Sequence, residues 1–102
     1  MMTDDITEII SIDDLRAFVN KTLCEHEQLE LGAFRLHERI LVRSGRPCGI
    51  HFTICGPRAV TFSAIWETER HTVLFYGCNG ERFHRTQLTA THKLADEFAM
   101  IQ

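Results

Sequence analysis

Hydrophobic and polar residues alternate with a period of two through most of the chain, which is typical of β-strands that bury one face. The alternation runs through five segments, at residues 33–43, 48–55, 60–66, 71–77 and 81–88. Turn residues separate the segments, and Asn79 and Gly80 form the strongest hairpin signal because a type I′ turn requires positive φ at both central positions. The pattern predicts a five-stranded antiparallel meander.

Two other segments follow the helical period. Ser11, followed by acidic residues, suits the start of a helix over about residues 12–27. A second, short helix is predicted after Thr89 or Thr91, with Leu94 and Phe98 on its apolar face. The expected architecture is therefore α+β, with an N-terminal helix, a five-stranded antiparallel meander and a C-terminal helix.

The register of the strands follows from which residues must share a face, because a slip of one residue reverses every side chain. Assuming short loops, the predicted pairs are Val42–Ile50, Ile40–Phe52, Arg39–Thr53, His37–Cys55, Ile54–Val60, Phe52–Phe62, Thr53–Thr61, His51–Ser63, Ala64–Val73, Phe62–Phe75, Ser63–Leu74, Phe75–His84 and Tyr76–Phe83. One face is strongly apolar, and we expect Phe52, Phe62 and Trp66 to be nearly fully buried there.

The opposite face of the predicted sheet is mixed. Its apolar members are Ile65, Leu74, Tyr76 and Phe83. A cluster of this size is expected to be covered by the C-terminal helix, by a ligand or by a second copy of the chain. If both helices occupy the other face, a two-fold homodimer is the expected solution. The other end of the mixed face carries the candidate ligand-binding residues Arg39, His51, Thr53 and Thr61.

Composition adds limits to this picture. The chain has 102 residues, of which 44% are hydrophobic and 25% charged, as in one globular domain. Residues 1–10 are expected to be an acidic, partly ordered tail before a single domain at 11–102.

No apolar run in the sequence approaches the roughly 20 residues of a membrane helix. The N-terminus is acidic where a signal peptide is basic, so we expect a cytoplasmic protein with reduced cysteines.

Charge is distributed unevenly, although the net charge is only −3. Acidic residues concentrate in residues 1–30, whereas basic residues concentrate in residues 31–95. Arg35, Arg39 and Arg43 form a row along one predicted strand, on the face that also carries predicted aromatic residues. Such a surface could bind single-stranded nucleic acid or an acidic ligand. Its simpler interpretation is a solvated face of a sheet that is neutralised by the acidic helix.

Cys55 and His37 are predicted neighbours and could act as nucleophile and base, or as two metal ligands. A second pair of ligands for zinc is missing from the predicted arrangement, and so is an acid behind His37.

The sequence contains no P-loop, dinucleotide-binding or zinc-protease motif. We therefore expect no metal and no cofactor, and we interpret the chain as a non-catalytic binding or assembly module. Its expected partners are a second copy of itself or an unknown protein or acidic molecule. The alternatives are a nucleic-acid or acidic-ligand binder and a small thiol enzyme or metal site.

Overall fold

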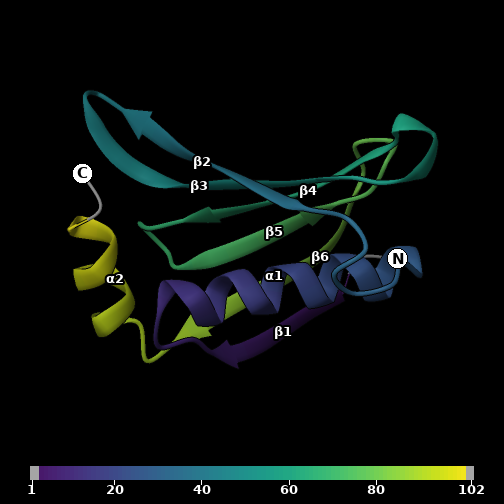
Figure 1. Cartoon of the computed structure of the whole chain (residues 1–102). Helices are drawn as coiled ribbons and strands as arrows, with labels where there is room; N and C mark the ends of the chain where they lie inside the picture. The colour runs from purple at the N-terminus through teal and green to yellow at the C-terminus, as the bar shows by residue number, and fades with distance from the viewer. Residues whose placement is uncertain (1–2, 101–102) are drawn as a thin grey trace.

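The computed structural model describes residues 3–100, which form a curved six-stranded sheet with helices on one side (Figure 1). The elements in chain order are β1 (Thr3–Glu8), α1 (Ile12–Glu27), β2 (Leu36–Arg43), β3 (Arg46–Cys55), the 3₁₀ turn η1 (Pro57–Ala59), β4 (Thr61–Glu67), β5 (Thr72–Tyr76), β6 (Arg82–Thr89) and α2 (His92–Ala99). The strands lie in the spatial order β1-β6-β5-β4-β3-β2. The predicted α+β class, both helices and the meander from β2 to β6 are confirmed.

The number of strands and the purely antiparallel sheet were predicted incorrectly, because Thr3–Glu8 adds a sixth strand that pairs in parallel with β6. This acidic segment has no strong apolar alternation, so the sequence pattern did not reveal it. Two further contacts accompany its pairing with β6: the backbone N–H of Ile9 donates to the carbonyl of Thr89 at 3.2 Å, and an Asp5 carboxylate oxygen lies 3.2 Å from His84 Nε2. The strand thus places the Asp5 carboxylate beside the His84 imidazole.

Helix α1 begins and ends where its sequence predicts. The Ser11 hydroxyl accepts a hydrogen bond from the backbone N–H of Asp14 at 3.1 Å, which satisfies one of the free N–H groups of the first turn. The helix ends at Glu27, and Gln28 takes the left-handed conformation with φ of 57°. Within residues 3–100, no helix is both long and apolar enough to cross a membrane.

Both helices lie on the same side of the sheet. Figure 1 shows the sheet bending around α1, with α2 beside one end of that helix. Phe18 of α1 meets Phe75 edge-on at a centroid distance of 5.8 Å, and Phe98 of α2 meets Trp66 at 4.9 Å. Because Phe75 and Trp66 belong to the same sheet face, the C-terminal helix does not cover the opposite face.

The predicted strand parity is correct, but most of the predicted registers are wrong by two residues. The observed pairs include His37–Thr53, Arg39–His51, Ile40–Ile50, Phe52–Ala64, Thr53–Ser63, Ile54–Phe62, Ser63–Tyr76 and Trp66–Val73. The loops are the reason: residues 56–60 form a longer connection than expected, closed by a 2.7 Å hydrogen bond from Gly56 N–H to Val60 O. A shift of two residues leaves each side chain on its predicted face, so the division into two faces remains valid for these strands.

The last hairpin combines a correct and an incorrect pair. Phe75 pairs with His84 as predicted, whereas an irregularity after Phe75 places Tyr76 opposite Arg82 in place of Phe83.

The predicted burial of the core is confirmed, since the exposed fractions of Phe52, Phe62 and Trp66 are 0%, 5% and 0%.

The burial of Phe52 gives a test of this core. We expect Phe52→Ala to lower the free energy of unfolding by about 3–5 kcal/mol, because it removes a ring from a site that cannot fully collapse. Val42→Ala is the matched control, since Val42 is 63% exposed and its truncation should change stability by less than about 0.5 kcal/mol. Urea unfolding measures both, and equal losses in the two variants would contradict the assigned core.

Candidate functional site

The sheet face opposite the helices, here called the open face, carries the residues that the sequence singled out. Strand register places Arg39, His51, Ile65, Leu74 and Arg85 in one row across five strands, from β2 to β6. The row has an apolar centre on β4 and β5, with basic side chains on both sides of it.

The apolar centre consists of Ile65, Leu74 and Tyr76. Ile65 and Leu74 are direct cross-strand neighbours, and all three side chains are partly exposed. The placement of Phe83 with them is wrong: its ring stacks on His26 of α1, with centroids 3.5 Å apart and planes 5° from parallel. The register irregularity between β5 and β6 causes this, because it turns Phe83 to the helix side.

A groove of about 230 Å³ lies beside this centre on β2 and β3, lined by His37, Glu38, Arg39, His51 and Thr53. Three of the four candidate ligand-binding residues, Arg39, His51 and Thr53, thus come together. The fourth, Thr61, is outside the lining of the groove: it begins β4, where it pairs with Cys55 and its hydroxyl is 4.0 Å from the thiol sulfur.

The charges around this groove favour an anion. The only acid in its lining, within the described residues, is Glu38, and Arg16 of α1 binds both of its carboxylate oxygens at 2.8 Å. Partial burial, and then the positive charge of Arg39, lower the pKa of His51. An acidic group entering the groove would therefore meet an arginine and two imidazoles without a competing free carboxylate.

The predicted neighbours Cys55 and His37 are not opposite each other, since His37 pairs with Thr53. The four cysteines are free. No cluster of three or more metal-ligating side chains occurs within residues 3–100. The structure thus removes the register on which the nucleophile–base interpretation depended.

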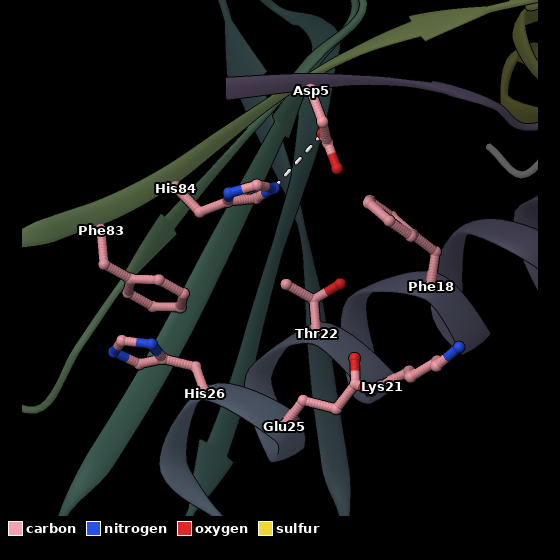
Figure 2. A pocket seen from close by; sticks show the side chains of 8 residues that line it. All are labelled: Asp5, Phe18, Lys21, Thr22, Glu25, His26, Phe83 and His84. Atoms are coloured by element: carbon pink, nitrogen blue, oxygen red, sulfur yellow. Dashed lines mark ion pairs between the residues drawn. The ribbon is translucent and has the colours of Figure 1, made fainter. Parts of the chain in front are cut away.

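A second, larger cleft was missed by the sequence. It has a volume of about 410 Å³ and lies between α1 and the edge formed by β6 and β1 (Figure 2). His84 Nε2 lies 3.2 Å from an Asp5 carboxylate oxygen, and the stacked His26 and Phe83 rings form another wall. The alternation of β6 could place His84 toward the helices. Nothing in the sequence indicated that Asp5 would lie beside it, because that required β1.

Figure 2 shows the Thr22 side chain between Phe18 and the His26–Phe83 stack. The Asp5 carboxylate lies beside the His84 imidazole, and a carboxylate next to an imidazole is one element of an acid–base site. A nucleophile would also need a hydrogen bond to that imidazole, and among the hydrogen bonds of the described residues none joins Thr22 to His84. The cleft therefore offers polar and aromatic contacts rather than an assembled catalytic group.

Comparison with models of known protein families, with curated proteins and with solved structures finds no significant match to this chain.

The proximity of Arg39 to His51 predicts a measurable change in titration. We expect Arg39→Gln to raise the pKa of His51 toward its ordinary value of 6.5, because the substitution removes a positive charge that disfavours the imidazolium. NMR titration of the His51 ring signals measures this. Arg43→Gln, on the same strand but outside the groove, serves as the control, and equal effects of both substitutions would contradict the assigned contact.

Proposed function

We propose that this protein is a non-catalytic binding and assembly module that forms a two-fold homodimer through its open face. One observation carries the proposal: both helices pack on the same side of the sheet, so neither helix covers the partly exposed Ile65, Leu74 and Tyr76 on the other side. Contiguous apolar groups of this kind on a soluble domain mark interaction surfaces.

The position of the apolar residues suits an isologous contact, in which the same patch serves both subunits. Ile65 and Leu74 lie on β4 and β5, the two central strands of the six-stranded sheet, with β6 and β1 on one side and β3 and β2 on the other. A two-fold axis through this pair brings each Leu74 against the apolar centre of the other subunit. Two sheets packed face to face in this way bury their facing side chains in a layer about 10 Å thick.

The residues around the centre have the composition of an interface rim. Arg39, Thr53 and Arg85 lie on the same face at its two sides. Interfaces typically combine an apolar centre with a polar, solvated rim, which contributes orientation more than affinity. The charged groups can therefore stay hydrated when the apolar centre closes.

The expected affinity is moderate. Full burial of a large apolar side chain contributes roughly 1.5–3 kcal/mol, but these three are already partly buried in the single chain. Association also costs about 4–15 kcal/mol in lost freedom of motion. We therefore expect a dimer that forms at micromolar concentration and dissociates on dilution.

Among the alternatives, the binder of acidic ligands has support from the groove around Arg39, because its lining acid Glu38 is already paired with Arg16. The thiol-enzyme alternative has less support, since Cys55 and His37 are not cross-strand partners.

Sedimentation at micromolar concentration tests the homodimer. We expect about twice the 11.8 kDa mass of one chain, and we expect Leu74→Asp to give a monomer because it places a charge in the apolar centre. Leu31→Asp is the matched control: Leu31 is 61% exposed in the loop after α1, away from the open face, and its variant should remain dimeric. A monomeric wild-type chain would refute the proposal, and a dimeric Leu74→Asp variant would show that another surface is used.

A further inference from the structure

Four side chains of β2 and β3 form a cluster of hydrogen-bond donors on the open face. Arg39 is opposite His51, and His37 is opposite Thr53, in adjacent positions of the same antiparallel pair. Direct cross-strand neighbours have Cβ atoms about 4.5–5.5 Å apart, and diagonal neighbours remain within reach of long side chains. The four side chains therefore surround one small area, the groove of about 230 Å³.

The acid on this face of the next strand, Glu67, is diagonal to His51, and its carboxylate accepts hydrogen bonds from the Arg70 backbone N–H at 3.0 Å and the Thr72 hydroxyl at 3.1 Å. On β4, the register partners of His51 and Thr53 are Ile65 and Ser63. The nearby carboxylate of Glu38 is held by both Nε and Nη2 of Arg16 at 2.8 Å. The hydrogen bonding to Glu38 is the main cause that raises the pKa of the Arg16 guanidinium above its ordinary value. The positive charge of Arg39 consequently remains available to a ligand.

We propose that this cluster binds the phosphate group of a phosphomonoester, with the Arg39 guanidinium as the principal contact and His37, His51 and Thr53 as further donors. Guanidinium groups bind phosphate through paired N–H donors, with stronger hydrogen bonds than neutral donors make. A phosphate ester presents three free oxygens and nearly two negative charges, which matches several converging donors better than the two oxygens of a carboxylate.

The size of the groove limits what it holds. Pockets for whole drug-sized ligands span about 300–1,000 Å³, so a groove of about 230 Å³ accommodates the phosphate group and leaves the rest of the ligand outside. Ser63 is the next side chain on this face, beside Thr53, and provides a hydroxyl toward which the ester group can extend.

The site is contained within one chain and does not depend on the homodimer. A bound phosphate also reverses the electrostatic effect on His51, because its negative charge favours the imidazolium that Arg39 and burial disfavour. The titratable or charged groups on the same face beside this imidazole are His37 and Arg39 on β2 and, diagonally on β4, Glu67, whereas the direct partner on β4 is Ile65. Phosphate binding should therefore raise the His51 pKa.

NMR titration with O-phosphoserine, at constant ionic strength maintained with chloride, tests the site. We expect saturable shifts of the His37 and His51 ring signals, a raised His51 pKa, and an affinity that Arg39→Gln weakens at least tenfold. Arg43→Gln should leave the affinity within twofold of wild type. Both arginines are exposed, so the folded state should survive, and the amide spectrum verifies this. Shifts that do not saturate, or equal affinities in the two variants, would overturn the proposal.

Parallel titrations identify the source of the phosphate. Inorganic phosphate and O-phosphoserine should both bind, whereas binding of inorganic phosphate alone would overturn the assignment to an ester. A short single-stranded oligonucleotide that binds where O-phosphoserine does not would overturn it in favour of a phosphodiester. The Leu74→Asp variant should bind O-phosphoserine as the wild type does; loss of binding there would refute a site contained in one chain, while leaving the test of self-association separate.

Discussion

The packing of α1 into the concave side of the sheet is the interaction on which the rest of the structure depends. The buried stripe of this helix includes Leu15, Val19 and Leu23, all with 0% exposure, and it meets a sheet face centred on Phe75 and Trp66. Dense packing of this kind is the main source of stability for a domain of this size. Because a helix covers only one face, this packing also determines which side of the sheet stays open.

The second helix reinforces that asymmetry. α2 places Phe98 against Trp66 and its Glu97 carboxylate accepts a hydrogen bond from the backbone N–H of Ile12 at 2.9 Å. The C-terminal helix thus satisfies one further free N–H of the first turn of α1 and closes one end of the same core. The open face keeps its apolar centre and its basic groove as a result, and both proposals for this protein concern that face.

Charge pairing between distant segments sets the chemistry of the surfaces. The sequence suggested an acidic helix against a basic sheet, but the observed pairs are more specific. Arg16 is a base on the helix that binds Glu38, an acid on the sheet, and Asp5 on β1 pairs with His84. The first pair leaves Arg39 available to a ligand, and the second forms a wall of the cleft beside α1. Exposed pairs of this type contribute little stability, but they decide which charges remain free.

Local pattern was enough to predict the two helices, the five strands of the meander and the face of nearly every core residue, because helical and strand periods are properties of neighbouring residues. It also placed Arg39, His51 and Thr53 on a common face. Only the tertiary structure decided the remainder. Loop conformations moved the registers by two residues and placed Thr53, in place of Cys55, opposite His37. A local irregularity turned Phe83 toward α1. The strand β1 pairs with an edge that β6 provides. Each of these depends on contacts between segments far apart in the chain, which the period of a single segment does not contain.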